Sequence, residues 1–85
     1  MARIIDSENT NIVGVNIRTL RRKKRMTQQA LSNKLELLGV YVCRGSVSRI
    51  DYGVRTVTDI ELLAIAKVLD VSINDLYMNL DNYFD

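Results

Sequence analysis

The chain has 85 residues, 47% of them hydrophobic, which suits one globular domain and excludes a disordered segment. It contains one cysteine and no histidine, which excludes histidine-based acid–base catalysis, an internal disulfide and a multi-cysteine metal site, so we expect no enzyme and no cofactor. The net charge of +2 conceals an asymmetry: residues 1–55 carry 11 Lys and Arg against 4 Asp and Glu, whereas residues 56–85 carry 1 against 6. Residues 1–55 could face phosphates, although charges that are simply exposed to solvent and bind nothing would give the same counts.

The first predicted element is a helix over residues 10–25, preceded by a flexible arm at residues 1–9, where no periodicity is visible. The apolar side chains at helical spacing are Val13, Ile17 and Leu20. The helix ends in a basic run at residues 21–25. Cations favour the negative end of a helix dipole, but five in a row exceed what the dipole needs.

Two further helices are predicted on either side of a short apolar segment. Thr27 is a favourable N-cap for the second helix, and Gly39 is a plausible stop after it. The third helix is predicted over about residues 44–52, with Val47 and Ile50 three residues apart on its inner face.

Two capping-box patterns predict the remaining helices. Residues 58–61 open a fourth helix, in which Ile60 and Leu63 are assigned to a broad apolar face, and residues 72–75 open a short fifth helix. An acidic, aromatic tail follows at residues 81–85. The aromatic side chains near this end are expected either to cover the end of the core or to contact a second copy of the chain. They are Tyr77, Tyr83 and Phe84.

The chain resembles the phage-repressor-type helix-turn-helix domain, often called the XRE family, over roughly residues 12–78. The segments that carry the resemblance are VGVNIRTLRRKKRMTQQALSNKL, SVSRIDYG and TDIELLAIAKVLDVSINDLY. The resemblance implies an all-α, compact five-helix domain of the lambda-repressor type at residues 10–80, in which the second and third helices form the helix-turn-helix. In this family the second helix lies across the DNA backbone and the third enters the major groove.

The resemblance also implies which residues contact DNA. Gln28 matches the glutamine that bonds a phosphate at the start of the second helix, and Arg49 matches a base-contacting position of the third. Arginine suits that position because it can donate two hydrogen bonds to guanine. The complete expected set is Gln28, Arg44, Gly45, Ser46, Ser48, Arg49, Tyr52 and Arg55. The alternative for each is an ordinary surface or packing role.

Arg21 has a different expected role, because in the family this arginine commonly pairs with an acid at the end of the third helix, here Asp51. Residues 23–25 are expected to be solvated, with occasional phosphate contact. Cys43 would suit a redox sensor at the edge of the DNA surface, but a half-buried small residue is the favoured interpretation.

The link between the second and third helices departs from the family pattern. Residues 36–42 make it longer than the usual turn of about three residues, so two unrelated helices joined by a loop are an alternative. We interpret the segment as the family motif with an extra half-turn on the second helix and a longer turn. Leu38, Val40 and Val42 would pin that turn to the core. The register of residues 43–46 depends on this interpretation.

These observations predict a sequence-specific transcriptional regulator, a repressor that binds double-stranded DNA at a palindromic operator as a homodimer. The alternative is an antitoxin or another protein-interaction module with the same fold and a protein partner, although residues 79–85 offer little chain to wrap one. We see no signal peptide and no apolar run near the roughly 20 residues that cross a bilayer, so we expect a soluble cytoplasmic protein without membrane contact.

Overall fold

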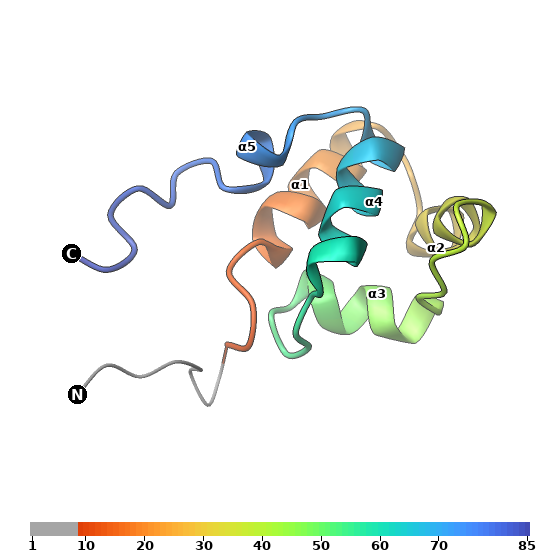
Figure 1. Ribbon diagram of the computed structural model, residues 1–85, viewed down its shortest axis with the longest axis horizontal. Coiled ribbons are helices and arrows are strands. Elements are labelled where there is room, and N and C mark those ends of the chain that lie inside the picture. Colours follow the sequence, from red (N-terminus) through yellow and green to blue (C-terminus); the bar gives the residue numbers. More distant parts are fainter. Residues whose placement is uncertain (1–8) are drawn as a thin grey trace.

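A computed structural model describes residues 9–85, and the regular structure in this range is entirely helical. The helices are α1 (Gly14–Lys23), α2 (Gln28–Leu37), α3 (Arg44–Asp51), α4 (Asp59–Leu69) and α5 (Ile73–Leu76), as Figure 1 shows. The predicted all-α architecture with five helices is confirmed. Apart from Asn9, the expected arm at residues 1–9 lies outside the described residues. None of the helices in residues 9–85 combines the length and apolar character needed to cross a membrane.

Helix α1 begins later than the predicted helix over residues 10–25, because the residues before it bond elsewhere. The side-chain amide of Asn11 donates to the backbone carbonyls of Ile50 at 3.1 Å and Arg55 at 2.8 Å. Its Oδ1 accepts a hydrogen bond from the Gly14 N–H at 2.8 Å. The segment that precedes α1 therefore supports the end of α3 and the loop after it instead of extending the helix.

Helix α1 ends at Lys23, two residues earlier than predicted. Arg25 has a left-handed backbone with φ of 55°, and the N–H groups of Arg25 and Met26 bond back to carbonyls of the last turn at 2.9 and 3.0 Å. This is the Schellman arrangement, in which glycine usually takes the left-handed position. Gly39 and Gly53 take that position after α2 and α3, with φ of 78° and 76°.

The link between α2 and α3 consists of residues 38–43, so the predicted lengthening of the turn is confirmed. Val42 is buried and Val40 is half-buried against the core, as expected. The expectation for Leu38 is wrong, because its side chain is 44% exposed. Leu38 still has the backbone geometry of a helix end, and the chain turns toward the core only after Gly39.

Both predicted capping boxes are present. At the start of α4 the Thr58 Oγ accepts from the Glu61 N–H at 3.1 Å, and a Glu61 carboxylate oxygen accepts from the Thr58 N–H at 3.0 Å. Ser72 and Asp75 repeat the arrangement at the start of α5, at 3.2 and 2.9 Å. Each box satisfies two backbone donors that the helix leaves without an acceptor, which fixes where the helix begins.

The predicted apolar face of α4 is partly wrong. Ile60 and Leu63 are 69% and 64% exposed, whereas Ile65 and Leu69 are buried. At about 100° per residue, Ile65 and Leu69 share one side of the helix, and Ile60 and Leu63 fall on the opposite side. Helix α4 therefore carries more apolar residues than the core covers.

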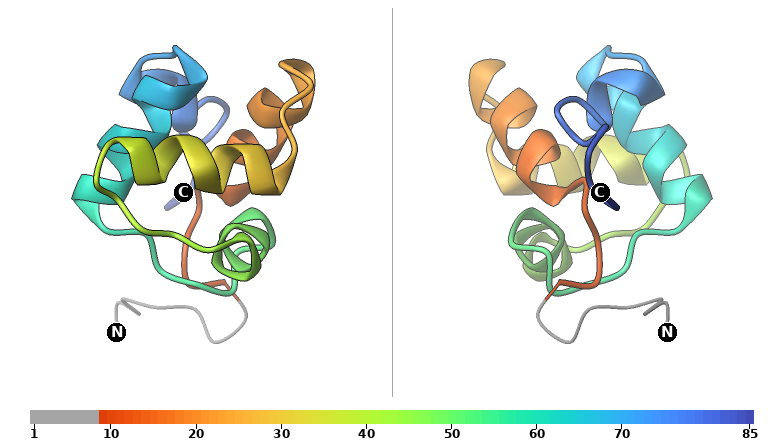
Figure 2. Two further views of the ribbon diagram at one scale, coloured as in Figure 1. Left: turned by 90° about the vertical axis from the view of Figure 1, so that its right-hand side faces the viewer. Right: turned by 90° about the vertical axis from the view of Figure 1, so that its left-hand side faces the viewer.

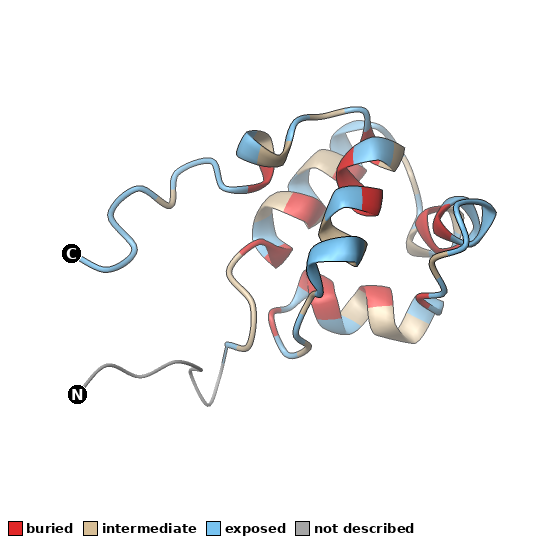
Figure 3. Cartoon of the chain, in the orientation of Figure 1, coloured by how far each residue is buried: buried red, intermediate tan, exposed pale blue. Residues whose placement is uncertain are grey.

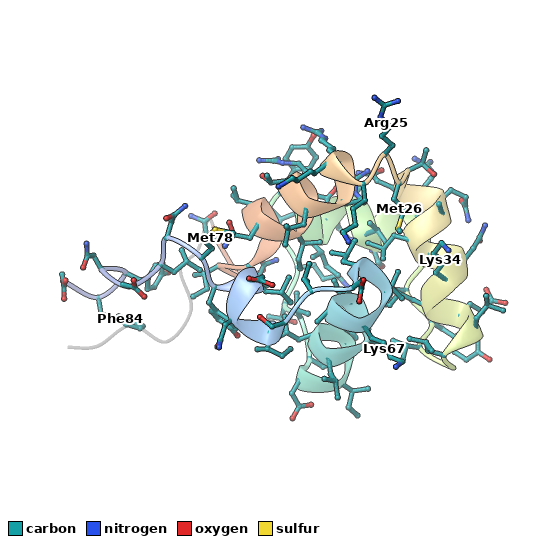
Figure 4. The ribbon with its side chains drawn as sticks, turned by 90° about the horizontal axis from the view of Figure 1, so that it is seen from above. Arg25, Met26, Lys34, Lys67, Met78 and Phe84 are labelled. Carbon is teal, nitrogen blue, oxygen red and sulfur yellow. The ribbon has the colours of Figure 1, made fainter. Side chains whose placement is uncertain are left out.

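The chain after α5 runs away from the helices (Figure 1). Its start is held by Asn16 of α1, whose side-chain amide donates to the carbonyls of Leu76 and Met78, both at 2.9 Å. Phe84 is 88% exposed and lies at the outer end of the tail (Figure 4), with its ring edge-to-face against Tyr83 at 4.8 Å between centroids. Phe84 therefore does not cover the core, which excludes that one of the two alternatives for this residue.

The core lies where the inner faces of the helices meet, and Figure 3 shows the buried positions turned toward one another. The side chains with almost no exposed surface include Ile17, Leu31, Leu35, Val47, Ile50, Ile65, Leu69 and Leu76. Helices α2 and α3 cross at a steep angle. The left view of Figure 2 shows this, since α2 lies lengthwise in it while α3 is seen along its axis. The other described helices leave the outer face of α3 uncovered.

Candidate nucleic-acid interface

A buried ion pair joins α1 to the last residue of α3. Arg21 Nη2 donates to Asp51 Oδ2 at 2.9 Å, and the two side chains are 6% and 0% exposed. Arg21 Nη1 also donates to the Met26 carbonyl at 2.8 Å. The predicted pairing is confirmed. It fixes the C-terminal end of α3 against α1 and against the turn that follows α1.

Gln28, the first residue of α2, shares the same acid. Its Nε2 donates to Asp51 Oδ2 at 3.0 Å, so one carboxylate oxygen binds both α1 and α2. The expectation from sequence was a phosphate contact for Gln28, and the bond to Asp51 was missed because the two residues are far apart along the chain. The side-chain amide therefore has a structural partner already. In the first turn of α2 the Ala30 N–H donates to the Thr27 hydroxyl at 3.0 Å, whereas the helix itself offers no acceptor for the N–H groups of Gln28 and Gln29.

The outward side of α3 carries a row of residues at positions i, i+3, i+4 and i+7, which we call the outer stripe. It consists of Gly45, Ser48, Arg49 and Tyr52. On the opposite side of the helix Val47 and Ile50 are each 1% exposed, which holds the outer stripe toward solvent. Arg44 and Ser46 lie at the two edges of the stripe by the same helical spacing. Six of the eight expected DNA-contacting residues are thus brought together on α3 and its C-cap.

Arg49 has a defined position on the outer stripe. Its Nη2 donates to Ser46 Oγ at 3.0 Å. A Cβ built on Gly45 would lie 3.7 Å from Arg49 Nη1, which is ordinary contact distance. The arginine therefore folds back over the first turn of α3, across the position where glycine has no side chain.

Cys43 is exposed, so the expectation of a half-buried residue is wrong. The neighbouring Val42 takes the buried place on the link, and Cys43 occupies the N-cap of α3. Its Sγ lies 3.4 Å from Ser46 Oγ. The Ser46 hydroxyl is the main reason that the pKa of the Cys43 thiol is lowered, with smaller contributions from the N–H groups at the start of α3 and from the Arg49 charge.

Arg55 forms an ion pair with Glu61, an acid to which the sequence pattern had assigned only a role in a helix cap. Its Nη1 and Nη2 donate to Glu61 Oε1 and Oε2, both at 2.9 Å, and Nη1 also donates to the Thr56 carbonyl at 2.9 Å. These hydrogen bonds raise the pKa of Arg55 and lower the pKa of Glu61. Arg55 therefore fastens the loop after α3 to the first turn of α4. A contact with a DNA backbone would have to share its guanidinium with Glu61.

Tyr52 has a cationic partner that sequence reasoning missed. The guanidinium of Arg18 on α1 lies 4.7 Å from the centroid of the Tyr52 ring, and Tyr52 is 57% exposed. A cation in this position is attracted by the face of the ring. No local pattern could have indicated the contact, because the two residues meet only when α1 packs against the end of α3. Arg18 thereby adds a positive charge beside the outer stripe.

The lengthened link also shapes the surface beside α3. It leaves a groove of about 550 Å³ between α2 and the start of α3. The lining includes Gln29, Asn33, Tyr41, Cys43 and Arg44. Within residues 9–85 no group of three or more His, Cys, Asp and Glu side chains is placed to hold a metal ion.

No protein-family model and no curated protein sequence matches the chain. Its structure is similar to that of the restriction-modification controller protein C.AhdI from Aeromonas hydrophila, with 28% sequence identity and a TM-score of 0.66 over 75% of this chain and 86% of that one. This chain has the helix-turn-helix fold of the phage-repressor type. The helix-turn-helix domain is also similar to the clp gene regulator ClgR from C. glutamicum, at 20% identity and a TM-score of 0.71 over 86% and 88% of the two chains. The DNA-binding domain of BldD is 21% identical, with a TM-score of 0.66 over 85% and 97%.

In this helix-turn-helix domain α2 and α3 are the two helices of the motif, and residues 38–43 are its turn. The interpretation as two unrelated helices is therefore excluded. The three similar proteins are named as a controller, a gene regulator and a DNA-binding domain, and none is named by an enzymatic activity.

Proposed function

We propose that this helix-turn-helix domain is a sequence-specific transcriptional regulator that binds double-stranded DNA with α3 in the major groove. The observation that carries the proposal is the outer stripe of α3, which presents Ser48, Arg49 and Tyr52 on a surface that the buried Val47 and Ile50 hold outward. An α-helix fits the major groove, where each base pair offers a distinct pattern of donors and acceptors. The names of the structurally similar regulators agree with this role.

The contacts are assigned by side-chain chemistry. Arg49 and Arg44 donate to guanine, and Ser46 and Ser48 bond bases or phosphates from the same helix. Gly45 allows close approach of the DNA because it has no side chain.

The flanking contacts involve the DNA backbone. At the start of α2, the N–H groups of Gln28 and Gln29 face a phosphate, where the positive end of the helix dipole adds to the attraction. Tyr52 and Arg55 lie along the sugar-phosphate backbone, with Arg55 keeping its bonds to Glu61.

The regulator acts as a repressor and binds a palindromic operator as a homodimer. The exposed aromatic ring of Phe84 supports self-association, since this residue is 88% exposed. The experiment that tests the main proposal is selection of binding sites from a random duplex library at near-physiological salt. Enrichment of two half-sites about 10 base pairs apart supports a dimeric operator-binding protein. Salt-sensitive retention of the library without an enriched sequence would overturn sequence-specific regulation.

Substitutions at Arg49 separate base contact from charge. Arg49→Lys keeps the positive charge but removes the two-pronged donor, so the preference for the selected site over random duplex should fall by about 1–3 kcal/mol while binding to random duplex persists. If Arg49 contacts a phosphate instead, Arg49→Lys leaves the preference unchanged, and Arg49→Ala weakens binding to both duplexes equally.

A second candidate function is a protein-interaction module such as an antitoxin. The exposed pair Ile60 and Leu63 on α4 favours it, because they form an apolar surface on the side of α4 opposite its core-facing residues. Ile60→Lys and Leu63→Lys should abolish binding of a protein partner but leave binding of a single domain to a half-site intact. Loss of half-site binding in these variants would contradict a separate partner surface.

A further inference from the structure

The link between α2 and α3 carries a large aromatic side chain that the core does not use. Tyr41 is 77% exposed, although the residues on either side of it pack inward. Val42 is buried, and Val40 is partly buried against the same core. The two valines thus fasten the backbone on both sides of Tyr41 and hold its side chain outward. Burial in the core therefore does not explain why a tyrosine stands at this position.

Tyr41 lies close to the first turn of α3. It comes three residues before Arg44, the first residue of that helix. It lines the groove between α2 and α3 together with Arg44 and Gly45, and Gly45 belongs to the outer stripe. A chain spans at most about 3.6 Å per residue, so the Cα atoms of Tyr41 and Arg44 are at most about 11 Å apart. Tyr41 therefore borders the surface that α3 presents.

The figures place the link on the same side of the molecule as α3. In Figure 1 the chain descends from α2 to the N-terminal end of α3, which is the end away from the loop that leads to α4. In the left view of Figure 2 both the link and α3 lie below α2. The link thus continues the exposed surface of α3 at the N-terminal end of this helix.

The charges around Tyr41 favour a contact with a base over a contact with a phosphate. The groove that Tyr41 lines also holds the exposed carboxylate of Glu36 on α2 and the exposed guanidinium of Arg44 on α3. The negative charge of Glu36 offsets the attraction that Arg44 alone would exert on a phosphate. An aromatic ring can contact the methyl group of thymine, and a phenolic hydroxyl can donate to or accept from a base edge. Both kinds of base contact are thus open to Tyr41.

We propose that Tyr41 contacts a base edge in the major groove next to the base that Arg44 reads, so that the lengthened link enlarges the half-site beyond the reach of α3. The proposal rests on the proposed DNA-binding function and adds a specificity-determining residue outside the helix. Arg49, Arg44 and Tyr41 follow one another toward and past the N-terminal end of α3. Base pairs are about 3.4 Å apart, so a displacement of up to about 11 Å corresponds to at most about three base pairs.

The test is selection of sites from a random duplex library with the unmodified protein and its variants, compared position by position. Tyr41→Ala should lower the base preference about fivefold at one position of the half-site and leave the other positions unchanged. That position should lie within about three base pairs of the one altered by Arg44→Ala, on the side away from the one altered by Arg49→Lys. Leu37→Ala is the matched control, because it removes an 86% exposed side chain of α2 that does not line the groove, and it should alter no position.

The outcomes separate this inference from the proposed function. If Tyr41→Ala selects the same site with the same preference at every position, Tyr41 reads no base and selection by α3 still stands. An equal loss of affinity for every sequence would also overturn the inference, because Tyr41 would then contact a phosphate. An altered oligomeric state with unchanged preferences would assign Tyr41 to a contact between proteins and overturn it as well. If the unmodified protein selects no site, this inference and sequence-specific regulation both fail. Unchanged melting temperatures of Tyr41→Ala and Leu37→Ala are the control for folding.

Discussion

Ser46 holds the guanidinium of Arg49, with Nη2 donating to Oγ at 3.0 Å one turn apart on α3. The hydroxyl of Ser46 also lies 3.4 Å from the Cys43 thiol, so it is fixed from both sides. An arginine that is positioned before DNA arrives loses less conformational freedom when it binds a base. Ser46 is therefore expected to influence base preference through Arg49.

Ser46→Ala should reduce the preference for the selected site by about 1 kcal/mol, which is about fivefold, because the arginine is no longer held. Binding to random duplex should change less. Ser46→Thr keeps the hydroxyl and is the matched control, which should restore the preference. The measurement is competitive binding between the selected site and single-base variants of it. A fall in affinity that is equal for every sequence would show that Ser46 contacts a phosphate and does not position Arg49.

Arg21→Ala should lower the free energy of unfolding by about 3–5 kcal/mol, because it leaves the carboxylate of Asp51 buried without its cation. For an 85-residue domain this is a large part of the total stability, which is typically about 5–15 kcal/mol. Urea denaturation followed by circular dichroism measures it. Arg22→Ala, next to it but exposed, is the control and should change stability by no more than about 0.5 kcal/mol. Equal effects of the two substitutions would contradict a structural role for the pair.

The pair of Arg55 and Glu61 should make stability depend on pH. The pKa of Glu61 is lowered below its ordinary value of 4.5 by Arg55, so the folded state holds the carboxylate in its charged form. The pair's contribution is complete above pH 4.5 and is lost as the pH falls through the lower pKa of the folded protein.

Glu61→Gln keeps an acceptor for the capping box but removes the charge, so it should cost about 1 kcal/mol near neutral pH and less below pH 4. Melting temperatures of both proteins across this range test the prediction. If the difference between the two melting temperatures were the same at every pH, the ion pair would contribute nothing to folding.

The same substitution at two helical glycines should have opposite effects. A Cβ on Gly14 would collide with the backbone carbonyl of Ile50, so Gly14→Ala should destabilise the domain by about 1–3 kcal/mol. A Cβ on Gly45 would meet only the side chain of Arg49 at ordinary contact distance, so Gly45→Ala should raise stability by about 0.5–1 kcal/mol. Chemical denaturation of the two variants gives both values side by side. Destabilisation by Gly45→Ala would show that α3 tolerates no side chain there.

Local sequence signals predicted the starts of three helices correctly. Thr27, Thr58 and Ser72 accept hydrogen bonds from N–H groups three residues ahead, so the information for each start lies within one turn. The pairing of Arg21 with Asp51 was also anticipated, but from the resemblance to a family and not from the spacing of the two residues.

The errors occurred where distant parts of the chain compete for the same groups. Helix α1 begins late because Asn11 bonds to carbonyls 39 and 44 residues away. The hydrogen bond from the Gln28 amide to Asp51 was missed because the acceptor belongs to another helix. Ile60 was assigned to the core because periodicity alone does not say how much apolar surface the neighbouring helices cover. Contacts of this kind are determined by the packing of helices, which no local pattern contains.

The hydrogen bonds from residues before α1 to the end of α3 have a consequence for the order of folding. The N–H of Thr10 donates to the Gly53 carbonyl at 2.6 Å, and Asn11 donates to the carbonyls of Ile50 and Arg55. During synthesis these donors leave the ribosome first, yet their acceptors follow about 40 residues later. A nascent chain that ends before Ile50 can form α1 and α2 but contains none of these three acceptors. The helix proposed to read DNA is therefore fastened at its C-terminal end only after most of the domain has been made.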